Sequence, residues 1–573
     1  MKRILWSPIS YRKISIGDFI ILLFIGSIIY AISSLNLYYT KSPQPLSFDL
    51  SPTKLPLYAI YSLIRMIFAY ILSFIFTLVY GYLAAYNKRL EKILIPLLDI
   101  LQSIPVLSFL PPVFMAVLAL FPGSKLGLEI VSIILIFTGQ VWNMVFSFYQ
   151  SLISIPRDLR EASKILKLNP WQRFWYLELP YSAIGLLWNS MMSVAGGWFF
   201  LMACEMFTIT NQEIVLPGIG SYLSFSAMKG DLNKIIYGLL TLITVIILID
   251  QLVWRPLTAW SQKFKMEFTK GDEVESTILI WYRRSQIVNI IRERIAHPLR
   301  EKINMFFVKK YIQEAKQISN PSKLIKIFNN IILALIILLV IRGAIGLGNL
   351  IIQLPLETWK QIIFSAFMTF LRVAVAVTIG LAWTLPVGVK IGMNPKLAKI
   401  FQPIVQIVAS VPATAVFPVI LMFLINTAGG LNLASILLML LGTQWYLLFN
   451  IIAGAMSIPK DLIEVSLLLK INKWEKWKTL ILPCVFPYLV TGGITAMGGA
   501  FNATIVSEYV QFGNKIIKTI GLGALITEAS STGNNALLAG ATLTMALMVV
   551  AINRLFWKRL FKLSEEKYSH LGG

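Results

Sequence analysis

Charged residues, cysteine and histidine are all scarce in this chain. Of its 573 residues, 14% are charged and 57% are hydrophobic, and a soluble protein of this size would carry more charge. Cys204 and Cys484 fall within apolar runs, where cysteine is usually a small buried hydrophobe. His297 and His570 are isolated, so the sequence shows no histidine-based metal site. These scarcities exclude an ordinary soluble protein and give no sign of a metalloenzyme.

Motifs for nucleotide hydrolysis and for catalysis are absent from the sequence as well. No Gly-x-x-x-x-Gly-Lys-Ser/Thr phosphate loop occurs anywhere in it, so we expect no ATPase site in this chain. No Ser/His/Asp or Cys/His grouping points to a catalytic centre. We therefore expect a protein that is not an enzyme and that holds no cofactor or metal of its own.

Long apolar runs are abundant. Many approach the roughly 20 residues that an α-helix needs to cross a bilayer. Clear examples lie at 19–35, 57–86, 130–153, 235–254, 327–341, 362–389, 431–456 and 536–556. A membrane β-barrel would instead show short segments of alternating hydrophobicity. The predicted fold class is an all-α polytopic membrane protein.

The chain repeats itself. Identical residues recur 307 positions apart and then, after a four-residue slip, 303 positions apart. The pairs include Arg65/Arg372, Gly81/Gly388, Asn87/Asn394, Pro105/Pro412, Pro111/Pro418, Pro156/Pro459, Glu161/Glu464, Pro180/Pro483, Glu205/Glu508, Gly218/Gly521 and Trp254/Trp557. A fixed period of this kind is the signature of a duplicated structural unit.

Each copy is predicted to contribute six membrane helices, about 12 in all. They fall near 18–35, 57–86, 96–121, 128–153, 180–208 and 235–255, and then near 326–344, 360–390, 401–425, 431–456, 484–510 and 535–556. The two domains are then 1–256 and 326–573, joined by a connector at 257–325. The third helix of each copy is interrupted by prolines, and such breaks are tolerated where protein or a cavity covers the freed backbone.

The formal net charge of +24 does not indicate nucleic acid. Basic residues cluster beside the apolar runs, near 88–92, 255–326, 390–399 and 558–562, where they mark the cytoplasmic side. Six crossings per copy place all these clusters, and both termini, in the cytoplasm. The first apolar run has no small-residue cleavage site after it, so we interpret it as a retained helix rather than a signal peptide.

The stretch 255–326 carries fifteen Lys and Arg residues against seven Asp and Glu. Ile287, Ile290, Ile291 and Ile295 recur at near-helical spacing within it. One interpretation is an amphipathic helix that lies on the membrane or on a partner. The alternative is a partly ordered charged linker.

Two cytoplasmic segments, each between a fourth and a fifth helix, stand out. The first coupling segment runs from Ser154 to Pro180 and the second from Ser457 to Pro483. Each is predicted to be a short helix, a break and a second helix, with the serines as caps and the first helix of copy one stopped by Asn169-Pro170. A small amphipathic helix that carries a carboxylate, here Glu161 or Glu464, is suited to docking into a groove of another protein. Trp171 and Trp474 are candidate aromatic anchors.

Both segments resemble the EAA loop of ABC importer permeases, whose pattern is Glu-Ala-Ala, three residues, Gly, and then Leu-Pro. The matching residues are Glu161, Ala162 and Ser163 with Leu179-Pro180, and Glu464, Val465 and Ser466 with Leu482-Pro483. Both copies depart from the pattern at the glycine, where Lys167 and Lys470 stand. The resemblance implies that these residues couple the chain to separate nucleotide-binding subunits.

Further motifs resemble the nitrate, sulfonate, taurine and bicarbonate branch of these permeases. They are Leu97-Leu98-Asp99, Ser103-Ile104-Pro105, Trp171-Gln172-Arg173, and Glu205-Met206 with Gly218-Ile219-Gly220. The resemblance implies a fused, duplicated anion permease in the inner membrane. It also implies two copies of an ABC ATPase, which would bind ATP and magnesium, and no nucleic acid. It leaves open whether a periplasmic binding protein takes part.

Ionisable residues inside a membrane are expensive and usually functional. Arg65 and Arg372 lie in the outer halves of the second helices, and Glu205 and Glu508 near the outer ends of the fifth, so their depths predict one Arg–Glu pair per copy. Each pair either stabilises its own bundle or leaves the arginine to attract an oxyanion. Other candidates to line a path, or to form ordinary interhelical hydrogen bonds, are Gln140, Asn143, Trp198, Gln444 and Asn502.

Two other functions compete with the ATP-driven importer. Secondary transporters are also built from repeats, but their repeats are often inverted, and six helices per copy make this repeat parallel. A secondary carrier also has no use for paired docking segments. A non-transporting scaffold or enzyme lacks support from any catalytic motif. The arginines and the family resemblance favour an anionic solute without identifying it.

Overall fold

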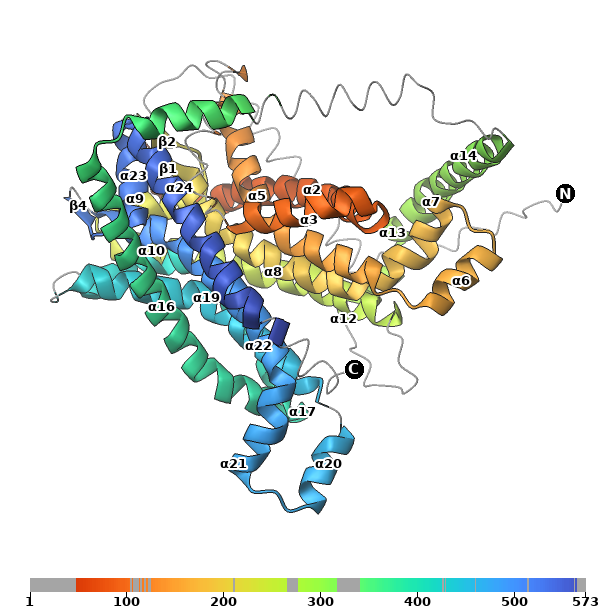
Figure 1. The fold of residues 1–573 in the computed structure, drawn as a ribbon. Helices are drawn as coiled ribbons and strands as arrows, with labels where there is room; N and C mark the ends of the chain where they lie inside the picture. Colours follow the sequence, from red (N-terminus) through yellow and green to blue (C-terminus); the bar gives the residue numbers. More distant parts are fainter. Residues whose placement is uncertain are drawn as a thin grey trace. The chain divides into compact units, whose positions relative to one another are not determined.

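The computed structural model describes residues 48–103, 106, 113, 116–117, 120–121, 125–209, 212–264, 277–316, 338, 341–424, 427, 429–458, 460–512, 515–560 and 562–563. Within them, eight helices are long and apolar enough to cross a membrane, or nine if one bent pair counts as a span. The chain is therefore a multi-span, mainly α-helical membrane protein (Figure 1). The predicted helix at 18–35, most of the one at 326–344, and Pro105, Pro111 and Pro112 lie outside the described residues.

The first copy contributes four long helices to the described residues. They are α2 (Leu55–Tyr86), α5 (Lys125–Ile153), α8 (Leu179–Glu205) and α10 (Leu232–Ile249). The 32 residues of α2 rise about 48 Å at 1.5 Å each, which exceeds the roughly 30 Å of bilayer hydrocarbon. A π-helical turn (Asp250–Trp254) joins α10 to α11 (Arg255–Ser261), so the sixth span ends later than predicted.

The second copy repeats this order. Its long helices are α16 (Leu356–Gly392), α19 (Gly430–Met456), α22 (Leu482–Ser507) and α24 (Asn535–Ile552), the last of which continues through a π-helical turn at Asn553–Trp557. All four coincide with predicted spans to within a few residues.

The third helices begin earlier than predicted, and the one in copy two is broken. In copy one, α3 (Lys88–Ser103) follows Asn87, and in copy two α17 (Pro395–Ser410) follows Asn394. Both asparagines accept backbone N–H bonds of the first turn through their side chains, which explains the early starts. A bend of 76° separates α17 from α18 (Ala413–Leu424), so the predicted interruption is confirmed in copy two.

Two β-hairpins were not predicted from the sequence. Antiparallel strands β1 (Met206–Ile209) and β2 (Gln212–Val215) follow α8, and β3 (Tyr509–Phe512) and β4 (Lys515–Lys518) follow α22. The fifth helices therefore end earlier than the expected 208 and 510. After each hairpin comes a short helix, α9 (Ile219–Met228) or α23 (Leu522–Thr532).

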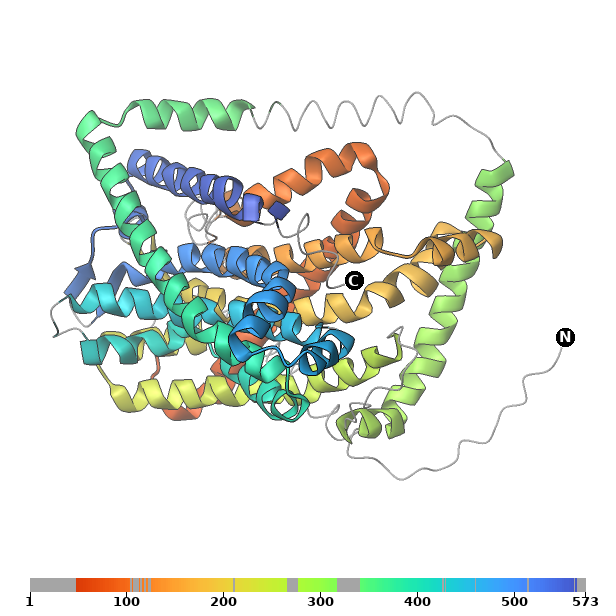
Figure 2. The same cartoon turned by 60° about the horizontal axis from the view of Figure 1, so that its bottom comes forward.

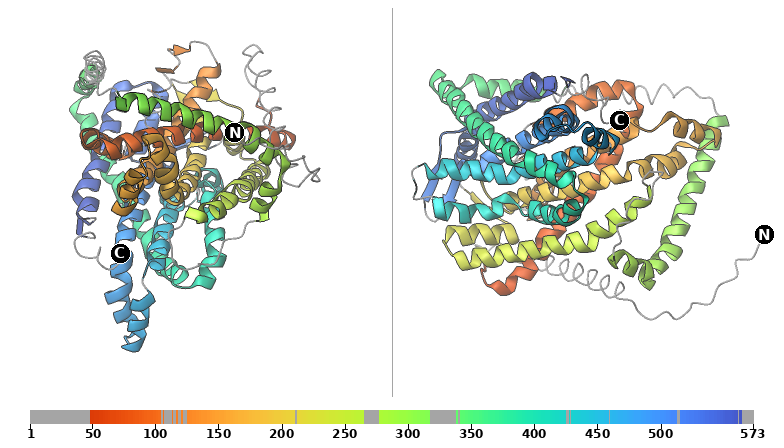
Figure 3. Two further views of the ribbon diagram at one scale, coloured as in Figure 1. Left: turned by 90° about the vertical axis from the view of Figure 1, so that its right-hand side faces the viewer. Right: turned by 90° about the horizontal axis from the view of Figure 1, so that it is seen from below.

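The coupling segments and the connector are helical. The first segment holds α6 (Arg157–Ile165) and α7 (Pro170–Arg173), and the second holds α20 (Lys460–Leu468) and α21 (Lys473–Lys476). The connector holds α12 (Thr277–Arg284), α13 (Gln286–Ile291) and α14 (His297–Lys316). Figure 2 shows the light-green α14 passing across the gold first segment, and the left view of Figure 3 shows α20 and α21 extending beyond α22.

Contacts divide the chain into two compact units that do not coincide with the two copies. One unit joins 146–191 to 247–333, and so contains the first coupling segment and the connector. The other joins 44–145, 192–246 and 334–573, and so contains much of the first copy together with the second copy and its coupling segment. The largest apolar core of this second unit draws Val373 from α16, Phe501 from α22 and Met545 from α24.

Close helix packing in this core depends on glycine. A Cβ added at Gly493 in α22 would lie 2.2 Å from Cη2 of Trp557. The indole of Trp557 is buried and donates its N–H to the Met497 sulfur at 3.0 Å. Because this ring is fixed, a larger residue at position 493 must push two helices apart.

We therefore expect Gly493→Ala to destabilise the bundle by roughly 1–3 kcal/mol, as overpacked cores generally do. Thermal unfolding in detergent measures the effect. The matched control is Gly498→Ala in the same helix, whose added methyl would meet no atom within 4 Å. Equal midpoints for the two variants would contradict this packing.

Candidate coupling and translocation sites

The first coupling segment turns at a left-handed residue. After α6, Lys167 adopts φ 50°, and Leu168 donates its N–H to the Ser163 carbonyl at 3.1 Å. This bond is the one that closes a helix in a Schellman motif. Asn169 then caps α7, because its side chain accepts the Gln172 N–H at 2.8 Å.

The second coupling segment makes the same turn from different residues. Lys470 adopts φ 51°, Ile471 donates to the Ser466 carbonyl at 3.2 Å, and Asn472 accepts the Glu475 N–H at 2.8 Å. The left-handed conformation costs a non-glycine residue about 1 kcal/mol or more. Lysine therefore keeps the backbone path that glycine would take at this position of the EAA pattern.

Two predicted details of these segments are wrong. Ser154 and Ser457 do not cap the segment helices, because their hydroxyls donate to the Ser151 and Gly454 carbonyls of the preceding helices. In addition, α6 is stopped by the left-handed turn at Lys167 before the chain reaches Asn169-Pro170. The asparagine begins the second helix instead of ending the first.

Both segments expose an apolar tip of two residues just before the left-handed lysine. The exposed fractions are 80% for Ile165 and 70% for Leu166, and 81% for Leu468 and 68% for Leu469. We call each pair a docking tip. The exposed apolar pair thus recurs at matching positions of the two repeats.

The EAA residues flank the docking tips. Glu161, Ala162, Glu464 and Val465 are exposed. By contrast, Ser163 and Ser466 are buried, and their hydroxyls donate to backbone carbonyls of their own helices. The first two residues of each motif are thus free to touch a partner, while the third secures the turn.

The two tryptophans of the segments differ in their surroundings. Trp474 is 78% exposed. The indole of Trp171 is half-buried, stacks on Phe307 of α14 with ring centroids 4.5 Å apart, and donates its N–H to Asn304 at 2.8 Å. Equivalent sequence positions therefore present unequal surfaces.

A buried ion pair joins α2 to the end of α8 in copy one. Arg65 donates through Nη1 to Glu205 Oε1 at 2.7 Å and through Nη2 to Glu129 Oε1 at 2.7 Å. Ser62 also donates to the Glu205 carboxylate, at 2.6 Å. The third donor to the Glu205 carboxylate is the Gly220 N–H at the start of α9, at 2.6 Å. Both charged groups are thus partnered.

Copy two builds the same cluster. Arg372 donates through Nη1 to Glu508 Oε1 at 2.8 Å, and Thr369 and the Gly523 N–H donate to the same carboxylate. Here Asn432 stands where copy one has Glu129, and it accepts from Arg372 Nε at 3.1 Å. The Arg–Glu pairing predicted from the sequence is present in both copies. We call these sets the arginine–glutamate clusters.

Glycines permit the clusters. A Cβ at Gly218 would lie 2.2 Å from the Glu205 carboxyl carbon, and one at Gly521 would lie 2.1 Å from a Glu508 oxygen. Gly218 belongs to the motif that resembles the anion permeases, and Gly521 is its equivalent in copy two. Because neither has a side chain, a carboxylate can lie at the N-terminus of the following helix, where the helix dipole favours it.

Four members of the clusters were not predicted from the sequence. They are Ser62, Thr369, Glu129 and Asn432. Ser62 and Thr369 are 307 positions apart and Glu129 and Asn432 are 303 apart, so the repeat spacing is a signal that points to both pairs. Their residue types differ between copies, and a search for identical residues passes over them.

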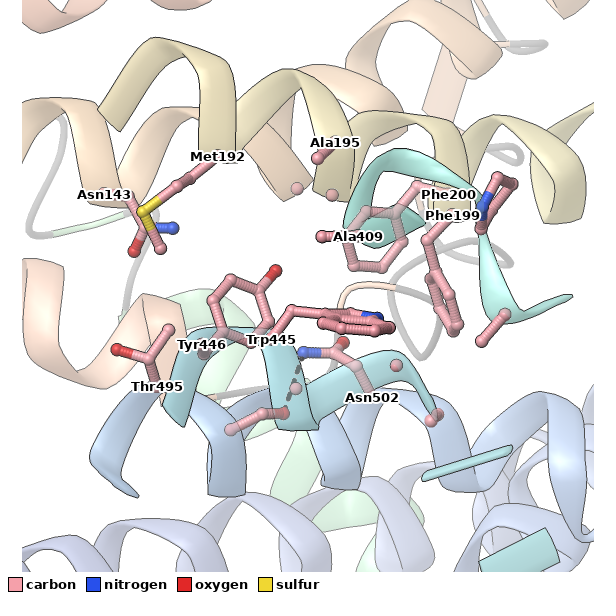
Figure 4. A pocket seen from close by; sticks show the side chains of 18 of the residues that line it. Asn143, Met192, Ala195, Phe199, Phe200, Ala409, Trp445, Tyr446, Thr495 and Asn502 are labelled. Atoms are coloured by element: carbon pink, nitrogen blue, oxygen red, sulfur yellow. Dashed lines mark hydrogen bonds between the residues drawn. The ribbon is translucent and has the colours of Figure 1, made fainter. Parts of the chain in front are cut away.

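A cavity of about 140 Å³ lies among helices of both copies within the second compact unit. Figure 4 shows Asn143 and Met192 from copy one opposite Tyr446 and Asn502 from copy two. Six aromatic side chains line it, Trp142, Phe199, Phe200, Trp445, Tyr446 and Phe449. Among the described residues that line the cavity, none carries a charge.

Two of the predicted path residues line this cavity. Asn502 Oδ1 accepts the Val106 N–H at 2.6 Å and its amide donates to the Gly498 carbonyl at 3.2 Å. Asn143 makes no side-chain hydrogen bond to any described residue. Its amide is therefore the more available of the two to a solute.

The other path candidates lie elsewhere. Gln140 donates to the Met66 sulfur, Gln444 accepts from Trp383, and Trp198 is fully buried. The four residues of the Arg–Glu pairs are also absent from the lining of this cavity. In the part of the chain that the structure describes, no group of three His, Cys, Asp or Glu residues is placed to hold a metal ion.

One family of known proteins matches the chain twice. The family described as "Binding-protein-dependent transport system inner membrane component" matches residues 77–253 and again 376–557. Together these matches cover more than half of the chain, and each contains one coupling segment.

Individual relatives are distant. Nitrate import permease protein NrtB of Leptolyngbya laminosa is 26% identical over 184 residues, which is 32% of this chain and 62% of that protein. Bicarbonate transport system permease protein CmpB of Synechocystis sp. is 27% identical over 170 residues, 30% of this chain and 58% of that protein. The chain thus spans about three fifths of each. Trimethylamine N-oxide transport system permease protein TmoV of Pelagibacter ubique is 22% identical over 549 residues, 87% of this chain and 70% of that protein.

The arginine–glutamate cluster of copy two gives a clean stability test. We expect Arg372→Gln to destabilise the protein by about 3–5 kcal/mol, because Glu508 is left buried without its countercharge. Arg372→Gln combined with Glu508→Gln removes both charges and is expected to recover most of that loss. Thermal unfolding of the two variants measures their losses of stability. If the double variant loses at least as much stability as Arg372→Gln alone, the ion pair is refuted as the source of that stability.

Proposed function

The chain belongs to the family of binding-protein-dependent transport system inner membrane components, and from that membership we propose that it is the membrane subunit of an ABC importer. It moves a small solute across the inner membrane by alternating access, and separate ATPase subunits drive the change. The proposed permease domains are 1–256 and 326–573, with the connector 257–325 between them and both termini in the cytoplasm. Each domain contains one of the family matches.

The paired docking tips carry this proposal. Two segments 303 positions apart each present an exposed apolar pair, a left-handed lysine and an exposed glutamate. A single partner with one groove would need only one such segment. Twin segments therefore favour two copies of an ATPase subunit, which hold the ATP and magnesium, and Glu161 and Glu464 are placed to pair with basic groups there. A carrier without an ATPase has no use for either segment.

The cavity is the proposed path for the solute. Asn143 offers amide hydrogens and Tyr446 a hydroxyl, and neutral donors of this kind bind an oxyanion without a full positive charge. Nitrate and bicarbonate appear in the names of similar permeases, which favours a small anion such as nitrate, a sulfonate or bicarbonate. A periplasmic binding protein would deliver it. Because both arginines are fully engaged by their clusters, we assign them a structural role.

Docking is tested by placing a charge on the tips. We expect Leu166→Asp combined with Leu469→Asp to abolish binding of the ABC ATPase subunit encoded nearest to this chain, because a carboxylate cannot enter an apolar groove without a large desolvation penalty. Titration of that subunit onto the purified protein in lipid nanodiscs measures the binding. The control, Lys470→Gly, preserves the left-handed turn and is expected to bind like the parent. Unchanged binding of the doubly charged variant would refute the tips as the docking site.

The path is tested by filling the cavity. Gly498 lines it, and a Cβ there would meet no atom within 4 Å, so Gly498→Leu is expected to enter empty space and reduce solute uptake at least about tenfold with the ATPase still bound. Uptake of labelled nitrate, a sulfonate and bicarbonate into proteoliposomes is the measurement. Gly343→Leu, also on a helix with open space around it, is the control. Full uptake by the filled variant excludes this cavity as the path.

A further inference from the structure

Connector helix α14 is seated on the first coupling segment. Three of its side chains make the contact: Phe307 stacks on Trp171 at an interplanar angle of 14°, Asn304 accepts the indole N–H at 2.8 Å, and the Arg300 guanidinium lies over the Tyr176 ring at 5.4 Å. The spacing of 300, 304 and 307 places these residues on one face of a helix. Segment and connector belong to the same compact unit.

This contact combines several kinds of interaction, two on the Trp171 indole and one on the Tyr176 ring. Stacking of aromatic rings and a cation over a ring each stabilise a contact beyond simple burial, and the N–H bond fixes the angle of the Trp171 ring. On the opposite side of α14, Met305 and Phe306 are exposed. Half-buried and exposed residues therefore alternate along α14 as expected for a helix docked by one face.

The connector is also tied to the sixth span of copy one. Tyr282 of α12 donates its hydroxyl to the Leu252 carbonyl at 3.1 Å, and Ser285 caps α13 by accepting the Val288 N–H. The connector therefore joins the first coupling segment to the end of a membrane helix of the same copy.

The second coupling segment has no comparable cover among the described residues. Trp474 is exposed, and the positions equivalent to Trp175 and Tyr176 are Lys478 and Thr479. Two of the aromatic rings that surround the first contact are thus replaced. The first family match ends at 253 and the second begins at 376, so α14 lies outside the part of the chain that matches the family.

We propose that α14 is a built-in clamp which occupies Trp171 and thereby makes the two ATPase docking sites unequal. The first site offers the ATPase its tip, Ile165 and Leu166, and the exposed Glu161, but no open tryptophan. The second site offers the same features together with the open face of Trp474, and so binds the ATPase more tightly. This inference rests on the proposed function, because it assigns unequal strengths to the two ATPase contacts proposed there.

The test compares one charged tip at a time, with and without the clamp. Leu166→Asp and Leu469→Asp are each made in the parent and in Phe307→Ala, and the ATPase subunit encoded nearest to this chain is titrated onto each protein in nanodiscs. In the parent, we expect Leu469→Asp to weaken binding about tenfold more than Leu166→Asp, since it removes the site with the aromatic anchor. In Phe307→Ala, where Trp171 is released, the difference is expected to fall below about threefold. Equal losses in the parent, or an unchanged difference in Phe307→Ala, overturns the proposal.

A second measurement needs no ATPase. Limited trypsin digestion reports whether α14 is seated, because its basic residues become targets when it leaves the segment. Trp171→Ala and Phe307→Ala are expected to speed cleavage within α14 at least about fivefold, and Met305→Ala on the exposed side to leave it unchanged. If all three variants are cleaved like the parent, the clamp is refuted. If the clamp is seen but the parent binds no ATPase, the proposed function fails instead.

Discussion

A buried ion pair between an arginine and a glutamate organises each half of this membrane protein. The bilayer interior offers no water to a charged group, so Arg65 and Glu205 each need a partner inside the protein. Their pairing draws α2 to the end of α8, and the Gly220 N–H draws the start of α9 to the same carboxylate. Copy two forms the equivalent ion pair between Arg372 and Glu508. Hairpins, short helices and membrane spans all meet at these clusters.

Duplication has kept this framework and changed what is attached to it. Glu129 in copy one is Asn432 in copy two, so the two clusters differ by one negative charge. The left-handed lysines and docking tips are alike, whereas one segment tryptophan is covered and the other is open. A single chain that contains both copies can change one half without changing the other. Two identical subunits in a symmetric dimer do not have that freedom.

Much of the fold was predictable from the sequence because membrane helices are long apolar runs and because the repeat locates each feature twice. The spans, the coupling segments and the Arg–Glu pairs follow from such local patterns. The hairpins could not be predicted, because strands of four residues leave too little alternation to detect. The role of Glu129 could not be predicted either, since it depends on where α5 lies beside α2. The packing of α14 on the first coupling segment depends on contacts between residues more than 120 positions apart, and the isoleucines of the connector suited a membrane surface equally well.

The proposed function requires that the two docking tips face the cytoplasm and touch an ATPase. A photoreactive side chain placed at Ile165 or at Leu468 tests this directly, in proteoliposomes that contain the chain and the ATPase subunit. Irradiation is predicted to attach the ATPase at both positions, and a membrane-impermeant thiol reagent is predicted to reach cysteines at these positions only from the cytoplasmic side. Labelling from the periplasmic side, or irradiation that attaches no ATPase at either tip, would contradict it.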